Sequence, residues 1–220
     1  MATTTRPTDA TGTRSTWSVL ARRPLTGWRG IDLVVGAVLA VAMGVAFWAW
    51  DNSLYHLVEG PAAVYAPIGS LVLGVWLLPA VAGALLVRRP GAALYVELIA
   101  ATVETLLGNK WAALVMLSAL LQGLGVELAM AVWRWRRFDL LTAVLGGVLA
   151  AVLEICCYEW WQYVPQLAPV HKLVYLALGM ISGAVIAGLG AGALVRALAR
   201  SGAVDAFPPA QEAREARRTA

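Results

Sequence analysis

The stretch IDLVVGAVLAVAMGVAFWAW, residues 31–50, carries one charged residue and is long enough to cross a lipid bilayer as a helix. A spanning helix needs about 20 mostly apolar residues. The rest of the chain shares this character, because 60% of its residues are hydrophobic and only 14% are charged. An average soluble domain is roughly half apolar and a quarter charged. The composition therefore predicts an all-α protein that is embedded in a membrane.

Five further apolar stretches follow the first, and together they predict a compact bundle of six transmembrane helices. Short breaks that carry charge, Gly or Pro separate the stretches, as expected for loops between helices. The third stretch is short, and Pro79 predicts a kink in the second. The six predicted spans are residues 31–50, 66–87, 91–107, 111–133, 138–163 and 170–195.

The six spans form a single predicted membrane domain, residues 28–198, which has a polar tail on either side. Residues 1–27 are rich in Thr and contain Arg, but they lack the short apolar core of a secretory signal. Residues 199–220 are polar and contain proline. We expect both tails to be disordered in the cytoplasm, because neither has enough apolar residues to form a core.

The positive charges predict the orientation of the bundle. Lys and Arg in short loops are retained on the cytoplasmic side of a membrane. In the six-span topology every arginine falls on the side of the chain ends, whereas Lys110 and Lys172 fall on the opposite side. The sequence thus predicts a multi-pass protein of the plasma membrane with both termini inside. Because this topology accounts for the excess of basic over acidic residues, no nucleic-acid partner is predicted.

The glutamates inside the predicted spans include Glu97, Glu104, Glu127 and Glu154. A carboxylate at the bilayer centre costs on the order of 3 kcal/mol, so we expect these side chains to face the interior of the bundle. Glu97 and Glu104 are seven residues apart and share one face of the third span. Glu154 shares a face of the fifth span with Tyr158 and Trp161, at helical spacing.

Hydrogen-bond acceptors and aromatic rings gather towards the predicted external end of these helices. Rings attract a cation through their quadrupole, which is worth about 2 kcal/mol when the cation is desolvated. The set therefore predicts a site for a small aromatic cation. The candidate ligand-binding residues are Trp48, Trp50, Asn52, Tyr55, Glu104, Asn109, Trp111, Gln122, Glu154, Tyr158 and Trp161.

Several of these features have a purely structural interpretation as well. Trp and Tyr concentrate at membrane interfaces whatever the function, which fits Trp160 best. Glu97 and Glu127 suit hydrogen bonds between neighbouring helices. The adjacent Cys156 and Cys157 have neither the spacing of a metal site nor that of a disulfide framework, so we expect small buried apolar filler and no metal.

A stripe of small residues, Gly36, Ala40 and Gly44, runs along the first span at four-residue spacing. Small residues let helices approach closely in lipid. We expect this stripe to dock another membrane protein. Comparable spacings in the last two spans are expected to pack inside the bundle, as for Gly146 with Ala150, Gly179 with Gly183, and Gly188 with Gly192.

The chain shows no pattern of an enzyme or an ATPase. A P-loop places Ser or Thr after its lysine, whereas both lysines here precede other residues, and no GxSxG or HExxH motif occurs. We expect no enzymatic activity and no cofactor, so that active transport would draw on a partner or an ion gradient. A proton-coupled transporter that uses Glu97, Glu104 or Glu127 is one alternative, although no inverted repeat is detected. An intramembrane enzyme with Glu154 and Glu159 as acid and base is a weaker alternative.

Three segments resemble the YkoE family, the substrate-binding S components of energy-coupling factor (ECF) vitamin importers. The segments are RRPGAALYVELIAATVETLLGNKW (88–111), LLQGLGVELAMAVWRWRRFD (120–139) and VAFWAWDNSLY (45–55), and the resemblance covers roughly residues 28–198. It implies a six-helix protein that captures thiamine, or its hydroxymethylpyrimidine precursor, from outside. It also implies docking on a transmembrane coupling subunit with cytoplasmic ATPase subunits, through small residues of the first helix.

Overall fold

The computed structural model describes residues 27–109, 111 and 114–219, and this part of the chain is helical with no β-strand. In chain order the elements are α1 (Gly30–Asp51), α2 (His56–Val64), η1 (Ala66–Val72), α3 (Gly74–Val87), α4 (Ala92–Leu107), α5 (Val115–Val132), α6 (Leu140–Glu154), η3 (Ile155–Glu159), α7 (Trp160–Gln162), α8 (Pro169–Ser182), η4 (Gly183–Leu189), α9 (Gly190–Ser201) and α10 (Pro208–Thr219). The segment η1 is a 3-10 helix, whereas η3 and η4 are π-helical turns inside longer helices.

Five helices in this part of the chain are long and apolar enough to cross a membrane. They are Gly30–Asp51, Ala66–Val87, Val115–Val132, Leu140–Gln162 and Pro169–Ser201. The predicted all-α membrane fold is therefore confirmed. Helix α4 has 16 residues, fewer than these five, and it packs between α1, α3 and α5. A count of six spans stays a prediction.

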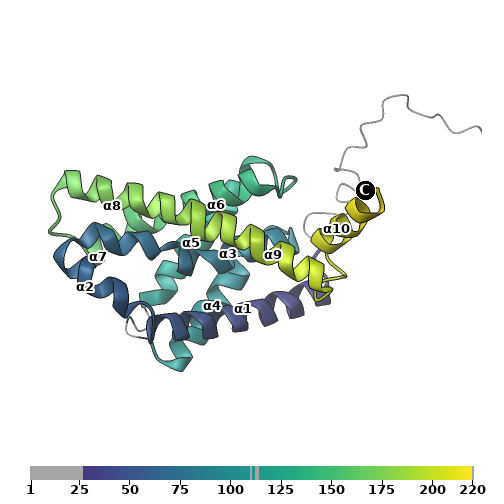
Figure 1. Ribbon diagram of the computed structural model, residues 1–220, viewed down its shortest axis with the longest axis horizontal. Coiled ribbons are helices and arrows are strands. Elements are labelled where there is room, and N and C mark those ends of the chain that lie inside the picture. Colours follow the sequence, from purple (N-terminus) through teal and green to yellow (C-terminus); the bar gives the residue numbers. More distant parts are fainter. Residues whose placement is uncertain (1–26, 110, 112–113, 220) are drawn as a thin grey trace, which may run out of the picture.

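The two ends of the bundle differ in what they carry (Figure 1). Helices α8 and α9 form one long rod with η4 between them, while α2 and α7 lie at one end of the molecule and α10 lies at the other. The guanidinium of Arg29 lies 5.4 Å from the ring centroid of Phe207, so α1 begins beside α10. The first and last described helices thus meet at one end of the bundle. Lys110 and most of the N-terminal tail lie outside the described residues.

Glycines allow α6 and η4 to pack with their backbones in contact. A Cβ added at Gly147 would clash with the carbonyl oxygen of Gly183, and one added at Gly188 would lie 2.7 Å from Cα of Val144. A Cβ at Gly179 would meet the side chain of Ile155. The prediction that small residues of the last span pack inside the bundle is confirmed for Gly179, Gly183 and Gly188, which all contact the fifth span.

The small-residue stripe of α1 lies against α4. Ala40 is fully buried, and a Cβ added at Gly44 would lie 2.7 Å from Cβ of Val103. Gly36 faces the ring of Tyr95 in the same way. The chain's own helix thus covers the stripe that the sequence predicts as a docking face for a partner. Small-residue spacing indicates close helix contact, but it does not say which helix makes that contact.

The segment after α9 also differs from the predicted disordered tail. Helix α10 begins at Pro208, and Val204, Phe207 and Ala210 are buried against the bundle. A bidentate ion pair between Arg88 and Glu212 ties α10 to the end of α3, with one N–O distance of 2.8 Å. The few apolar residues of this polar segment lie on one face, and that is sufficient for docking on the bundle.

Candidate functional site

A cavity of ≈ 280 Å³ lies at the end of the bundle that carries α2 and α7. Nearly every membrane helix contributes to its wall, and α2 and η1 contribute the small residues Ala62, Ala66 and Gly69. The larger lining side chains are Phe47, Tyr55, Leu73, Trp76, Glu97, Glu104, Trp111, Val115, Ser118, Gln122, Glu154, Glu159, Tyr163, Val164 and Tyr175.

Four carboxyl groups line this cavity, two on α4 and two on the helix that runs from α6 through η3. Glu97, Glu104, Glu154 and Glu159 are each at most 7% exposed. None of the described residues that line the cavity is a Lys or an Arg. The described part of its wall is therefore rich in hydrogen-bond acceptors and has no basic side chain that would neutralise them.

Three of these carboxyl groups have an oxygen atom that accepts no hydrogen bond from the described part of the chain. The atoms are Oε1 of Glu104, Oε2 of Glu154 and Oε2 of Glu159. Buried polar atoms in folded proteins are nearly always paired. The cavity thus presents acceptors that a ligand with N–H groups or a positive charge would satisfy.

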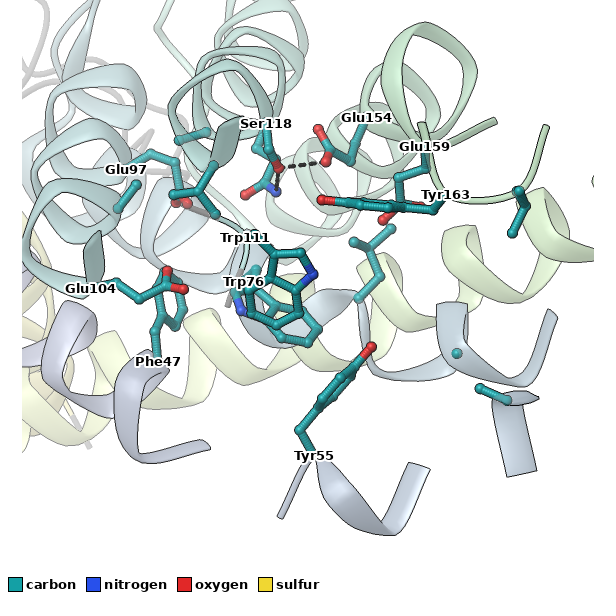
Figure 2. A pocket seen from close by; sticks show the side chains of 18 of the residues that line it. Phe47, Tyr55, Trp76, Glu97, Glu104, Trp111, Ser118, Glu154, Glu159 and Tyr163 are labelled. Carbon is teal, nitrogen blue, oxygen red and sulfur yellow. Dashed lines mark hydrogen bonds between the residues drawn. The ribbon is translucent and has the colours of Figure 1, made fainter. Parts of the chain in front are cut away.

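A polar pair on α5 connects the two groups of glutamates. Ser118 Oγ lies 2.5 Å from Glu154 Oε1, as the dashed line in Figure 2 marks. When the amide nitrogen of Gln122 faces α3, it donates to the carbonyl oxygen of Trp76 (3.1 Å) and to Glu97 Oε1 (3.0 Å). Because the side-chain oxygen of the same amide then lies 2.7 Å from Ser118 Oγ, a continuous series of polar contacts crosses the cavity wall from α4 to α6.

Glu97 and Gln122 also hold α3 together at Pro79. Proline lacks an N–H group and disturbs the hydrogen bonds of the preceding turn. Here the N–H of Ala80, whose regular helical acceptor would be the carbonyl of Trp76, donates to Glu97 Oε2 at 2.8 Å. The Trp76 carbonyl in turn accepts from Gln122. Helix α3 therefore continues through Pro79 because two lining residues satisfy the disturbed backbone groups.

Three aromatic rings form a cluster between the two groups of carboxyls. Tyr55, Trp76 and Trp111 contact one another edge to face, with ring centroids 5.3–5.7 Å apart. In Figure 2 they lie between Glu97 and Glu104 on one side and Glu154 and Glu159 on the other. Burial, followed by the nearby charges of Glu59, Glu159 and Asp51, raises the pKa of Tyr55. Its phenol therefore stays neutral at physiological pH.

The π-helical turn η3 determines which side chains of the fifth span reach the cavity. A regular α-helix would place Tyr158, at i+4, on the face of Glu154. A π-turn closes its hydrogen bonds at i+5, and it is Glu159, at i+5, that lines the cavity with Glu154, followed by Tyr163. Such turns occur frequently at functional sites.

Five of the eleven candidate residues predicted from sequence line the cavity: Tyr55, Glu104, Trp111, Gln122 and Glu154. Two others support it from behind. Trp50 packs edge to face on Trp76 with centroids 6.4 Å apart, and the hydroxyl of Tyr158 lies 3.4 Å from that of Tyr163.

The remaining four predicted residues lie outside the cavity wall. Trp48 and Trp161 are 38% and 69% exposed. The side-chain amide of Asn52 donates to the carbonyl oxygen of Trp48, one turn earlier in the chain. Asn109 bonds the hydroxyl of Thr105 and the backbone N–H of Trp111, so it shapes the loop that carries that tryptophan.

The lining residues that were not among the candidates include Trp76, Glu159, Tyr163 and Tyr175. Trp76 and Tyr175 lie in spans that carry no other sign of a site. In a regular α-helix, Glu159 and Tyr163 would not share a face with Glu154. The π-turn η3 shifts the helix register by one residue and brings both side chains to the cavity. An intramembrane glutamate is itself a signal of function, and by that criterion Glu159 was detectable.

No group of three or more His, Cys, Asp or Glu side chains in the described part of the chain is placed to hold a metal ion. Cys156 is partly exposed and Cys157 is exposed, so neither is the buried filler that the sequence predicts. Glu127 lies outside the cavity and accepts from the N–H of Ala93 and from Trp135 Nε1. It thereby caps the start of α4, which is a structural role.

A helical membrane bundle with a cavity of buried carboxyls and indoles at one end defines a membrane-embedded substrate-binding protein. The chain belongs to the family described as ABC-type cobalt transport system, permease component, whose model matches residues 31–153. It is 29% identical over 197 residues to YkoE of Bacillus subtilis (strain 168), whose name describes an HMP/thiamine permease, and the match covers 89% of this chain and 97% of that protein.

A solved structure agrees with this assignment. The crystal structure of an S-component of an ECF transporter matches with a TM-score of 0.81 and 28% identity, covering 88% of this chain and 96% of that one. The chain is thus a homologue of YkoE and a substrate-binding S component of an ECF transporter. These relatives are transporters, so the predicted absence of enzymatic activity is confirmed and the intramembrane-enzyme alternative is set aside.

Proposed function

We propose that this S component captures thiamine in the carboxylate-lined cavity, from the external side of the plasma membrane. The observation that carries the proposal is the pairing of buried, partly unsatisfied glutamates with a three-ring aromatic cluster, in a cavity wall whose described residues include no Lys or Arg. Thiamine combines an aminopyrimidine, which donates hydrogen bonds, with a positively charged thiazolium. The name of the YkoE relative points to the same ligand.

The chemistry of the two halves of thiamine matches the two kinds of wall. The amine would donate to free glutamate oxygens, and the thiazolium would lie against the faces of Trp76 or Trp111, where a desolvated cation gains about 2 kcal/mol. A volume of ≈ 280 Å³ is near the lower end of the roughly 300–1,000 Å³ of ligand pockets and suits a ligand of two small rings. Helix α2, which lines the cavity at Ala62, would close on the bound ligand.

Calorimetric titration of the purified full-length protein tests the ligand. We expect one thiamine per chain, weaker binding of hydroxymethylpyrimidine, which lacks the cation, and no binding of Co²⁺. Glu104→Gln should weaken thiamine binding about tenfold, because one of the two carboxyl oxygens that can accept from the ligand is replaced by an amide NH₂ group, which can only donate. Glu127→Gln is the matched control, since Glu127 is a buried glutamate outside the cavity. Tight binding of Co²⁺, or equal loss of thiamine affinity in both variants, would refute the proposal.

Transport would depend on an ECF coupling subunit and cytoplasmic ATPase subunits. The S-component assignment supports such partners, and Glu127, one of the carboxylates considered as a proton carrier, already has two hydrogen bonds that fix α4. Uptake of labelled thiamine by cells should therefore disappear when the ATPase subunits are deleted and should survive a protonophore that leaves ATP levels intact. The reverse result would favour a proton-coupled transporter.

A further inference from the structure

A second cavity, of ≈ 330 Å³, lies at the opposite end of the molecule, next to α10. Its walls come from the end of α3, the start of α6, the last turns of α9, and α10. Helix α6 packs tightly on η4 but touches α9 little, so the gap opens where α6 and α9 separate. One wall is apolar, and its Leu140 is 44% exposed, so the cavity reaches the outer surface of the bundle.

Three arginines line this cavity, and one of them is fully engaged. Arg88 forms the bidentate ion pair with Glu212 and lies 5.4 Å from the ring centroid of Phe138. The other acidic residue in the wall, Asp139, accepts from the N–H of Thr142 and from Arg137. Both acidic groups of the cavity are therefore already neutralised.

The other two arginines, Arg196 and Arg200, have no such partner. No hydrogen bond or ion pair joins either side chain to the part of the chain that the structure describes. They are four residues apart on α9, where like charges share a helix face and destabilise it. An anion between them would remove this repulsion.

Gly192 makes room for one of these cations inside the gap. A Cβ added at Gly192 would lie 3.2 Å from Cδ1 of Leu140 and 3.7 Å from Nη1 of Arg196. The guanidinium of Arg196 thus folds back along α9 towards α6, next to the apolar wall. A charged group and an apolar surface meet in the same cavity.

We propose that this cavity binds the phosphate headgroup of an anionic phospholipid. Arginine forks hold phosphate in a bidentate geometry, and basic pockets between transmembrane helices bind anionic headgroups. The partly exposed Leu140 provides a path along which the acyl chains leave towards the bilayer. Because α10 contributes Pro209 and Ala213 to the same wall, the bound lipid also contacts this helix.

Native mass spectrometry of the detergent-purified full-length protein, titrated with dioleoyl phosphatidylglycerol or dioleoyl phosphatidylcholine, tests the proposal. We expect the wild type to retain phosphatidylglycerol preferentially. The double change Arg196→Gln with Arg200→Gln should raise the half-saturating phosphatidylglycerol concentration about thirtyfold, because each arginine near an anionic headgroup contributes somewhat more than about fivefold. The control is Arg217→Gln with Arg218→Gln, which removes the same charge from exposed positions of α10 outside the cavity.

The variant Gly192→Leu distinguishes lipid binding in the cavity from nonspecific attraction to a positively charged surface. It keeps both arginines but fills the gap between α6 and α9. We expect it to reduce phosphatidylglycerol retention as well. Equal retention of the two lipids, equal losses in the cavity variant and in the α10 control, or full retention in a folded Gly192→Leu protein would each overturn the proposal. Displacement of the lipid by glycerol phosphate at equal concentration would identify a soluble phosphate compound as the ligand, and would overturn it too.

Discussion

Glu97 contributes to both the fold and the cavity. One of its oxygens accepts the N–H of Ala80 next to Pro79, and the other lies within reach of Gln122. The side chain is 1% exposed, so a lost partner cannot be replaced by bulk water. The stability of α3 is therefore tied to a residue that faces the ligand site.

Replacement of this carboxylate separates its two roles. Glu97→Ala leaves the N–H of Ala80 buried without an acceptor, which should cost about 2 kcal/mol and lower the melting temperature. Glu97→Gln keeps an oxygen acceptor and should melt close to the wild type. Intrinsic tryptophan fluorescence of the detergent-purified proteins during heating measures both. An alanine variant as stable as the wild type would show that Ala80 finds another partner.

A comparison of Glu159 with Trp161 tests which side chains of the fifth span line the cavity. Glu159 lines the cavity with one free buried oxygen, whereas Trp161 is 69% exposed and donates to the carbonyl of Cys156. Glu159→Gln should therefore weaken thiamine binding about tenfold, and Trp161→Ala should leave it unchanged within error. Calorimetry on the two variants checks this, and the opposite pattern would mean that the helix keeps a regular α-helical register in the protein.

At the scale of the elements, the contact between α6 and η4 depends on particular glycines rather than on apolar surface. A Cβ added at Gly147 would clash with the carbonyl oxygen of Gly183. The nearest atom to a Cβ added at the neighbouring Gly146 would be in the side chain of Val126, at an ordinary contact distance of 3.5 Å. Two adjacent glycines of one helix thus have very different tolerance for a methyl group.

This difference predicts opposite effects for the same substitution. Gly147→Ala forces a backbone shift and should destabilise the protein by about 2 kcal/mol. Gly146→Ala fits, and it should be neutral or slightly stabilising because alanine is the better helix former by about 1 kcal/mol. Thermal melting of the two purified variants provides the comparison, with Gly146→Ala as the matched control. Similar melting temperatures would mean that α6 is farther from η4 than the structure places it.

The same elements show what the sequence is able to predict. Uninterrupted apolar length is a property of the chain itself, so α1, the η1 and α3 segment and the rod from α8 to α9 are found close to their predicted limits. The π-turn at Ile155–Glu159 leaves no comparable mark, and it moves Glu159 into the cavity in place of Tyr158. Likewise, Gly44 indicates a close contact, but only the folded chain shows that α4 makes it.

For the molecule as a whole, the two cavities divide the bundle into a carboxylate end and an arginine end. The carboxylate cavity lies at the end of α2 and α7, and the arginine cavity lies beside α10. Positively charged loops stay on the cytoplasmic side of a membrane. This charge separation favours the orientation in which the carboxylate cavity opens outside and the arginine cavity faces the cytoplasm.

The orientation can be tested with single cysteines at the two ends. Gly60 is exposed on α2 with no atom within 4 Å of an added Cβ, and Gln211 is exposed on α10. In a background where Cys156 and Cys157 are replaced by Ser, Gly60→Cys should react with a membrane-impermeant maleimide on intact cells. Gln211→Cys should react only after the membrane is opened, because the arginines that flank it hold that end inside. Labelling of Gln211→Cys on intact cells, with Gly60→Cys protected, would place the carboxylate cavity on the cytoplasmic face and exclude the proposed capture from outside.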